Sequence, residues 1–228
     1  MNIVETVELT KSYQQGDTTI HALDHVNLKI KSADFAALVG PSGSGKTTLL
    51  NMIGGLDTPS SGQIIVADID FTACKPKQLS QIRRDTIGFV FQSYNLIPVL
   101  TAKENTEFIL DLQGKSAEDK TDISLKVLER VGLKGFENRR PDQLSGGQQQ
   151  RVAVARAIAA APSIVLADEP TANLDSKNAE SLMDLMLQLN QEEGITFLFS
   201  THDERVIRRA RRKITLVDGK ISDDIIVG

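Results

Sequence analysis

The order of apolar and polar residues predicts strands of two kinds. Apolar residues alternate with polar ones in two early stretches, at Val4, Val7 and Leu9 and at Val26, Leu28 and Ile30. Three other stretches are almost entirely apolar, at residues 35–39, 164–167 and 196–199. We expect the alternating stretches to be strands with one buried face. The other three are expected to be central strands of a parallel sheet, which helices cover on both faces.

Helix signals dominate much of the remaining chain. Residues 101–104, Thr-Ala-Lys-Glu, form a capping box, and Asp175 can cap a helix with an apolar stripe at Leu182, Leu185, Met186 and Leu189. Residues 216–221 predict a hairpin with an Asp-Gly turn. The alternation of strands and helices predicts an α/β fold in a single domain, residues 1–228. Its α/β core with an antiparallel β layer would comprise residues 1–92 and 162–228, and a helical subdomain would be inserted at 93–161.

Composition narrows the class of protein. With 228 residues, 40% of them apolar and 25% charged, the chain can bury a core, so a disordered protein is excluded. A net charge of −4 argues against binding nucleic acid through bulk positive charge. The single cysteine, Cys74, excludes an internal disulfide. No run approaches the roughly 18 apolar residues of a membrane span and the first residues are not a signal peptide. We therefore expect a soluble, cytoplasmic chain that reaches a membrane only through a partner.

A phosphate-binding motif lies directly between the apolar stretch 35–39 and a predicted helix. The residues that fit G-x-x-x-x-G-K-[ST] are Gly40, Pro41, Ser42, Gly43, Ser44, Gly45, Lys46 and Thr47. Backbone N–H groups of such a loop curl around phosphate oxygens, and the helix N-terminus adds its positive dipole end. We expect Lys46 to reach the β- and γ-phosphates and the Thr47 hydroxyl to bind Mg²⁺. The motif predicts nucleoside triphosphate binding without indicating what the energy drives.

Two adjacent carboxylates end another predicted central strand. Asp168 and Glu169 follow the apolar stretch 164–167. Ligands of a parallel sheet sit at the carboxyl ends of its strands, so we expect Asp168 beside the phosphate loop, where it can hold Mg²⁺ or its waters. Glu169 can accept a proton from a water that attacks the γ-phosphate. An acidic helix cap or turn is the simpler alternative for an Asp-Glu pair taken alone.

Residues 144–151, Leu-Ser-Gly-Gly-Gln-Gln-Gln-Arg, precede an Ala- and Val-rich helical stretch. Locally they form a Ser-x-x-Gln capping box. Two glycines within a cap lower helix propensity, so a second anion-binding helix N-terminus is the stronger interpretation. With this signature motif the chain resembles the ATP-binding-cassette (ABC) ATPases over essentially all of its 228 residues. The resemblance implies a P-loop NTPase (RecA-like) core, with ATP and Mg²⁺ as cofactors.

The resemblance also implies further site residues. Tyr13 resembles the aromatic that stacks on adenine, and Ala22 occupies a position that touches the same ring. Gln92 resembles the glutamine that contacts Mg²⁺ and links the nucleotide to the transmembrane partner. His202 resembles the switch histidine at the γ-phosphate, and Thr48 would join the nucleotide contacts. Catalytic roles would fall to Glu169, His202, Gln92 and Lys46, and metal-binding roles to Thr47, Gln92 and Asp168.

The position of the signature motif predicts a shared active site. The helical subdomain separates it from the phosphate loop, so it looks unable to reach the loop of its own chain. Family members pair head to tail, and each signature closes over the partner's ATP. The residues expected to act in trans are Ser145, Gly146, Gly147, Gln148 and Asp175. The expected partners are a second copy of the chain and an integral membrane permease at the cytoplasmic face of the inner (plasma) membrane. No nucleic acid is expected.

Residues 54–62 and 91–98 are most similar to a bacterial branch that holds the ATPases of macrolide-exporter and lipoprotein-releasing systems. Two positions depart from that pattern, Ala172 in place of glycine and Thr106 in place of valine. The alternatives are a regulatory or mechanotransmission module, an ATPase acting on DNA or the ribosome, and a small-molecule kinase. A kinase would leave the signature without a role. Basic residues in 205–213 predict a solvated helix face and turn, or else contact with anionic lipid or the permease.

Overall fold

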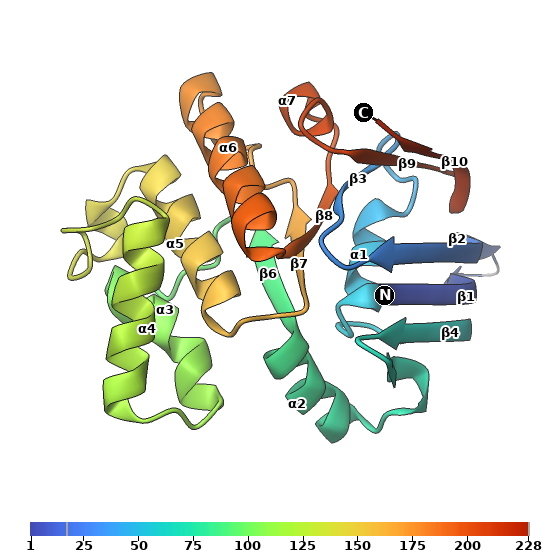
Figure 1. The fold of residues 1–228 in the computed structure, drawn as a ribbon. Coiled ribbons are helices and arrows are strands. Elements are labelled where there is room, and N and C mark those ends of the chain that lie inside the picture. Colours follow the sequence, from blue (N-terminus) through green and yellow to red (C-terminus); the bar gives the residue numbers. More distant parts are fainter. Residues whose placement is uncertain (17, 228) are drawn as a thin grey trace.

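Two β-sheets form the framework of the molecule (Figure 1). The computed structural model describes residues 1–16 and 18–227. Within these ranges the larger sheet has the order β10-β9-β3-β8-β7-β6, with strands β3 (Phe35–Val39), β6 (Ile87–Phe91), β7 (Ile164–Asp168), β8 (Thr196–Ser200), β9 (Arg212–Val217) and β10 (Lys220–Ile226). The smaller, antiparallel sheet has the order β2-β1-β4-β5, with strands β1 (Asn2–Gln15), β2 (Thr18–Lys31), β4 (Ser61–Val66) and β5 (Ile69–Asp70). The predicted α/β fold with an antiparallel layer is confirmed.

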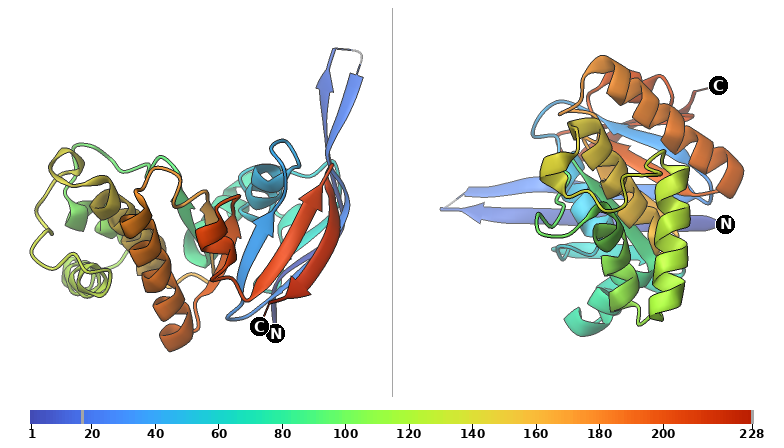
Figure 2. Two further views of the ribbon diagram at one scale, coloured as in Figure 1. Left: turned by 90° about the horizontal axis from the view of Figure 1, so that it is seen from above. Right: turned by 90° about the vertical axis from the view of Figure 1, so that its left-hand side faces the viewer.

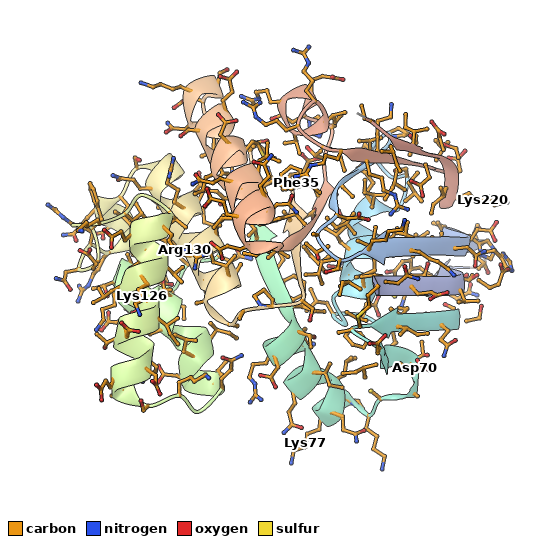
Figure 3. All side chains as sticks on the ribbon, in the orientation of Figure 1. Phe35, Asp70, Lys77, Lys126, Arg130 and Lys220 are labelled. Carbon is orange, nitrogen blue, oxygen red and sulfur yellow. The ribbon has the colours of Figure 1, made fainter. Side chains whose placement is uncertain are left out.

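The three nearly continuous apolar stretches form the centre of the larger sheet, as predicted. Strands β3, β8 and β7 are parallel neighbours, and every residue of β3 and β8 is buried. On one face Phe35, labelled in Figure 3, is buried and packs edge-to-face against Phe197 and Phe199. On the other face Leu38 and Leu198 pack in a second core cluster. Because both faces are covered, apolar residues fit at every strand position.

Helices surround the larger sheet and extend beyond one side of it. Their bounds are α1 (Lys46–Ile53), α2 (Pro76–Thr86), α3 (Ala102–Leu112), α4 (Ala117–Arg130), α5 (Gly146–Ala159), α6 (Ser176–Glu193) and α7 (Glu204–Ile207), with 3₁₀ turns at Phe71–Ala73 and Pro141–Gln143. Helices α3, α4 and α5 gather on the side away from the smaller sheet (Figure 1). Helix α5 packs against β6 as well as α3 and α4, so it contacts both parts. The division at residues 93 and 161 stays a prediction.

The predicted helix caps are present. The Thr101 hydroxyl accepts a hydrogen bond from the Glu104 N–H, and the Glu104 carboxylate accepts one from the Thr101 N–H. Asp175 accepts from the Asn178 N–H at 2.9 Å, which starts α6. The apolar stripe of α6 is buried, as expected. No helix in residues 1–16 or 18–227 combines the length and apolar character needed to span a bilayer.

One prediction for the first strand is wrong. Val4 and Leu9 are buried, but Val7 is 40% exposed and Thr6 lies in the core instead. The pairing of β1 with β2 shifts register between Thr6 and Leu9, where Glu8 has a φ of 48°. A bulge adds one residue to a strand and changes which side chains face inward, so the alternation begins again at Leu9. Beyond the bulge, the far ends of β1 and β2 project from the sheet (Figure 2).

The apolar pattern of the chain did not predict strand β6, which lies at the end of the larger sheet beside β7. Gly88 interrupts its apolar pattern, and glycine is depleted in strands. A Cβ at this position would lie 2.5 Å from the Ala157 carbonyl oxygen of α5. The glycine is therefore present because helix α5 approaches the strand closely, which is a tertiary contact.

The predicted hairpin joins β9 to β10. Asp218 and Gly219 have φ values of 47° and 76°, the left-handed conformations that a two-residue type I′ turn requires. The Gly219 N–H donates to the Ser44 carbonyl oxygen at 3.0 Å. This turn therefore supports the phosphate-binding loop that follows β3.

Candidate active site

A cavity of about 650 Å³ lies at the carboxyl ends of β3, β7 and β8, next to the start of α1. The residues that line it are Ala22, Gly40, Pro41, Ser42, Gly43, Ser44, Gly45, Lys46, Thr47, Thr48, Gln92, Asp168, Glu169, Ser200 and His202. The fold thus brings the phosphate loop, the acidic pair, the glutamine and the histidine together. Ligands of parallel sheets bind at this edge. Tyr13 and the signature residues are not among the residues lining the cavity.

Glycines shape the phosphate loop through two close contacts. A Cβ on Gly40 would collide with the carbonyl oxygen of Leu216, and a Cβ on Gly45 would collide with that of Ala22. Both glycines have positive φ, at 153° and 103°, which side-chain-bearing residues rarely adopt. The second contact explains why Ala22, far away in the sequence, borders the cavity.

Lys46 begins helix α1 and lies in the curve of the loop. Its Nζ donates to the carbonyl oxygens of Gly40 at 2.7 Å and Pro41 at 3.0 Å. The first turn of α1 contains no acidic side chain, so nothing within that turn neutralises the positive end of the helix dipole. A lysine ammonium and a helix N-terminus at one point form a strong anion-binding arrangement.

Several side-chain oxygen atoms lie close together in the cavity. Thr47 Oγ1 lies 3.2 Å from Asp168 Oδ2 and 3.4 Å from Oδ1. The hydroxyls of Ser44 and Ser200 are buried and have no hydrogen-bond partner within the described part of the chain. Buried hydroxyls are normally satisfied. Both serines line the cavity, so these groups are free to bind a polar ligand.

Glu169 is held by two neighbours. His202 Nδ1 lies 2.7 Å from Glu169 Oε1, and the Thr201 hydroxyl donates to Glu169 Oε2 at 3.1 Å. The His202 side chain is 78% exposed, whereas that of Glu169 is 17% exposed. The arrangement gives a fixed carboxylate beside an accessible imidazole, as a proton acceptor at a phosphate site requires.

The residues that support this pair, Thr201 and Asp203, were not predicted from the sequence. Thr201 is fully buried, and its hydroxyl accepts from the Asp203 N–H at 3.0 Å. Asp203 in turn accepts from the Thr171 hydroxyl at 2.6 Å and from Arg205. Hydrogen bonds from Arg205, and then from Thr171, lower the pKa of Asp203 to about 2. Only their positions in the chain, on either side of His202, could have indicated that Thr201 and Asp203 belong to the site.

The signature motif lies outside the cavity of its own chain. Ser145 is exposed and caps α5 together with Gln148, so the expected capping box is present. A Cβ on Gly146 would meet the Tyr94 hydroxyl at 2.9 Å, and one on Gly147 would meet Asn178 Oδ1 at 2.8 Å. The two glycines therefore allow the loop before α3 and the first turn of α6 to pack against this turn. Asp175, which caps α6, is also exposed.

Tyr13 lies on β1 at the border of this region. The residue is 44% exposed, and its hydroxyl donates to Asp57 Oδ2 at 3.1 Å. Burial, and then Asp57, raise the pKa of Tyr13, while Thr48 opposes the shift slightly. Ser12, next to Tyr13, pairs with His21, next to Ala22, and Ala22 lines the cavity, so Tyr13 lies near its edge.

Most of the basic residues at 205–213 bind partners in the same chain. Arg205 pairs with Asp203 and Arg209 with Asp184. Arg211 donates to Asn190, and Arg212 pairs with Asp34 and Asp224. These contacts favour the structural interpretation of the basic run over a lipid-binding surface.

Sequence comparison places these motifs in a wider context. A family model described as "ABC transporter" matches residues 23–172. An uncharacterized ABC transporter ATP-binding protein of Methanocaldococcus jannaschii, MJ0796, is 47% identical over 96% of this chain and 95% of its own length. The lipoprotein-releasing system ATP-binding protein LolD of Anaeromyxobacter dehalogenans is 47% identical, with 96% and 93% covered. The macrolide export ATP-binding/permease protein MacB of Mannheimia succiniciproducens is 42% identical over 98% of this chain, which spans 35% of that relative.

Solved structures agree with the sequence comparison. A dimeric, post-hydrolysis state of the ATP-binding cassette MJ0796, bound to ADP and Pi, superposes with a TM-score of 0.90 at 46% identity, covering 99% of both chains. A second dimeric structure of MJ0796, described as a bacterial ABC transporter cassette, gives the same TM-score at 45% identity.

Proposed function

The chain belongs to the ABC transporter family of ATP-binding subunits, and on that premise we propose that two copies close around two ATP molecules and drive a separate membrane permease. As an ABC ATPase the chain binds and hydrolyses ATP. One observation carries the proposal. The residues suited to bind phosphate and to activate water line one cavity. Ser145 and Asp175 are exposed outside that cavity. Each copy therefore offers half of a site to the other.

Within the cavity each group has a chemical task. Backbone N–H groups of the phosphate loop and the Lys46 ammonium bind the β- and γ-phosphates. Glu169 accepts the proton of the attacking water, which places the new O–H bond on Oε1 or Oε2. The water oxygen bonds to the γ-phosphorus as the bond from that phosphorus to the β–γ bridging oxygen breaks, which releases ADP. His202 contacts both Glu169 and the γ-phosphate. Thr201 and His202 limit the movement of the Glu169 carboxylate, which keeps it in position for the proton transfer.

The donor set fits Mg²⁺. Thr47 Oγ1 and Asp168 Oδ2 are 3.2 Å apart, and Gln92 lines the same cavity. Hydroxyl, carboxylate and amide oxygens are the hard donors that Mg²⁺ accepts. Among the described residues no cluster of three or more His, Cys, Asp or Glu side chains offers a metal site by itself, which suits an ion that shares its shell with nucleotide and water. Mg²⁺ held there would neutralise charge on the β- and γ-phosphates.

The second half of each site would come from the partner. Ser145, Gly146, Gly147 and Gln148 form a helix N-terminus that supplies N–H donors to the γ-phosphate of the opposite copy, and Asp175 lies near the two-fold interface. The MJ0796 structures are dimers, one of them with ADP and Pi, which supports this assembly. ATP would then hold the copies together, and loss of phosphate would release them.

The relatives support a transport system of the lipoprotein-releasing or macrolide-export kind. LolD is described as the ATP-binding protein of a lipoprotein-releasing system, and MacB as a macrolide export ATP-binding/permease protein. We assign the present chain a permease partner of that type, at the cytoplasmic face of the inner membrane. Reconstitution with a candidate permease in proteoliposomes should raise the rate of ATP turnover. A rate that is the same with and without the permease would count against this partner.

The substitution Glu169→Gln tests the catalytic assignment. The amide keeps the shape of the side chain but cannot accept the proton, so hydrolysis should fall by about 10²- to 10⁴-fold while ATP binding persists. The ATP-bound dimer should accumulate on size-exclusion chromatography. Glu180→Gln, an exposed change on α6, is the control and should leave both properties unchanged. A monomeric Glu169→Gln protein with wild-type turnover would refute the assignment.

A further inference from the structure

Three side chains next to the nucleotide cavity form a connected group. Lys11 Nζ donates to Asp57 Oδ1 at 2.9 Å and to the Thr58 carbonyl oxygen at 2.8 Å. The Tyr13 hydroxyl donates to the other carboxylate oxygen, Asp57 Oδ2, at 3.1 Å. Lys11 Nζ also lies over the Tyr13 ring, 5.0 Å from its centroid. The phenol is therefore held at its hydroxyl and covered on one face.

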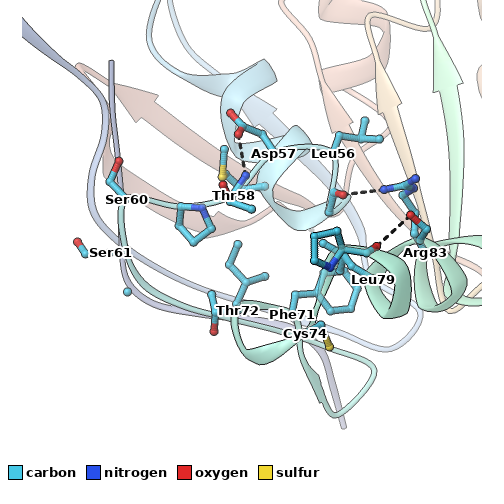
Figure 4. Close-up of a pocket in the computed structure, with 17 residues that line it drawn as sticks. Leu56, Asp57, Thr58, Ser60, Ser61, Phe71, Thr72, Cys74, Leu79 and Arg83 are labelled. Carbon is cyan, nitrogen blue, oxygen red and sulfur yellow. Dashed lines mark hydrogen bonds between the residues drawn. The ribbon is translucent and has the colours of Figure 1, made fainter. Parts of the chain in front are cut away.

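The group joins two elements. Lys11 and Tyr13 are two residues apart on β1, and their side chains lie on the same side of it, because Lys11 Nζ lies over the Tyr13 ring. Asp57 follows helix α1, whose end is fixed by hydrogen bonds from the Gly54 N–H to Leu50 and from the Leu56 N–H to Asn51. Figure 4 shows Asp57 accepting from the Thr58 N–H beside a second cavity of about 430 Å³. The ring is thus tied to the same helix whose first turn faces the phosphate site.

We propose that Asp57 and Lys11 are positioning residues for the nucleotide base, which fix the Tyr13 ring so that one face stays free to stack on adenine. The inference rests on the proposed function, in which Tyr13 is the stacking aromatic. Neither Asp57 nor Lys11 needs to touch the nucleotide. Both act through the tyrosine, and helix α1 then sets the distance between base and phosphates.

The physical benefit is preorganisation. An exposed tyrosine samples several rotamers, and a base that stacks on it must first select one of them. Immobilising such a side chain on binding weakens affinity by about three- to tenfold. In this structure Asp57 and Lys11 restrict the ring in advance. Burial would raise the pKa of Asp57, but hydrogen bonds from Lys11, the Thr58 N–H and Tyr13 outweigh it and lower that pKa, so the carboxylate persists at neutral pH.

A comparison of two ligands tests the proposal. ATP carries a base, whereas inorganic tripolyphosphate engages only the phosphate loop. Asp57→Asn should raise the Kd of Mg-ATP about three- to tenfold and leave the Kd of Mg-tripolyphosphate unchanged, both measured by calorimetry. Asp70→Asn is the matched control, because that carboxylate also accepts side-chain hydrogen bonds in the smaller sheet, from Gln63 and Thr72. It should change neither constant.

A double-mutant cycle separates this proposal from the stacking assignment itself. Tyr13→Ala should weaken ATP binding but not tripolyphosphate binding, and adding Asp57→Asn to it should cause no further loss. The positioning role is overturned if Asp57→Asn weakens the binding of ATP and tripolyphosphate equally, or if it changes neither Kd. It is also overturned if Asp57→Asn still weakens ATP binding in the Tyr13→Ala background. If Tyr13→Ala leaves ATP binding intact, the stacking assignment fails as well.

A spectroscopic readout checks the contact directly. The chain has two tyrosines and no tryptophan, so Tyr94→Phe leaves Tyr13 as the sole phenol. Burial and Asp57 raise the pKa of Tyr13. In the Tyr94→Phe background, Asp57→Asn should lower that pKa, because phenolate no longer forms beside a negative charge. An unchanged ultraviolet titration would show that Asp57 does not hold the ring and would overturn the proposal.

Discussion

Glu169 adopts a φ of 46°, a left-handed conformation that a residue with a side chain rarely takes. Its N–H donates to the Ser200 carbonyl oxygen at 2.9 Å, and Thr201 and His202 hold the two carboxylate oxygens. Strained residues of this kind cluster at active sites, where the surrounding structure maintains them. The position of this carboxylate is therefore set by β8 and the residues after it.

Thr201→Val tests that support at the level of one hydroxyl. Valine preserves the buried volume but removes the hydrogen bond to Glu169, so kcat should fall on the order of tenfold with little change in the KM for ATP. Steady-state ATPase assays measure both constants. Thr201→Ser retains the hydroxyl and should keep most of the activity. A valine variant with wild-type kcat would show that the hydroxyl does not position the base.

Asp203, the residue before helix α7, links the end of β8 to the loop that follows β7. Asp203 caps the helix by accepting from the Arg205 N–H at 2.9 Å. The same carboxylate accepts from the Thr171 hydroxyl, which is fully buried in the loop after Glu169. The cap therefore fixes two elements that both border the cavity. Asp203 must be ionised to serve both partners fully, which makes this junction sensitive to acid.

The pH dependence of the junction follows from its pKa. Because folding lowers the pKa of Asp203 from 3.8 to about 2, its stabilisation is present above about pH 4 and is lost as the pH falls toward 2. Asp203→Asn should lower the free energy of unfolding at pH 7 by up to about 2 kcal/mol, less any solvent screening. Urea titrations at several pH values should show the difference shrinking with acid. A difference independent of pH would contradict this account.

In the molecule as a whole, the part formed by helices α3, α4 and α5 holds the signature turn apart from the phosphate cavity. The phosphate cavity lies at the strand ends of the larger sheet, and the signature turn lies at the start of α5. Gln150 of α5 donates to the Pro170 carbonyl oxygen at 2.8 Å, so the signature helix is anchored to the core. A rigid anchor of this kind would keep the signature at a fixed offset from the cavity, as a head-to-tail pair requires.

Mixing two inactive variants tests whether sites are shared between copies. Lys46→Ala disables the phosphate loop, and Ser145→Arg blocks the signature turn. In a mixed dimer both defects fall in one site and the other site is intact, so activity should return to about a quarter of wild type in a one-to-one mixture of independent sites. ATPase assays of each variant alone provide the baseline. Mixtures that stay inactive would contradict a composite site.

Local patterns in the sequence predicted much of the framework. The apolar runs at 35–39 and 196–199 became buried central strands, because a strand covered on both faces tolerates apolar residues at every position. The caps at Thr101 and Asp175 were predictable because a cap depends on residues within one turn. Val7 was misplaced because the bulge at Glu8 reflects pairing with β2 and β4.

The sequence by itself determined the chemistry proposed for this protein, because the phosphate loop, the acidic pair, the signature and the histidine are each recognisable from a short stretch of residues. Only the tertiary structure decided how they are supported. Thr201, Asp203 and the Asp57–Lys11–Tyr13 group act through contacts between separate elements. A side chain's hydrogen-bond partner in another strand or helix depends on the path of the whole chain, and no local pattern encodes it.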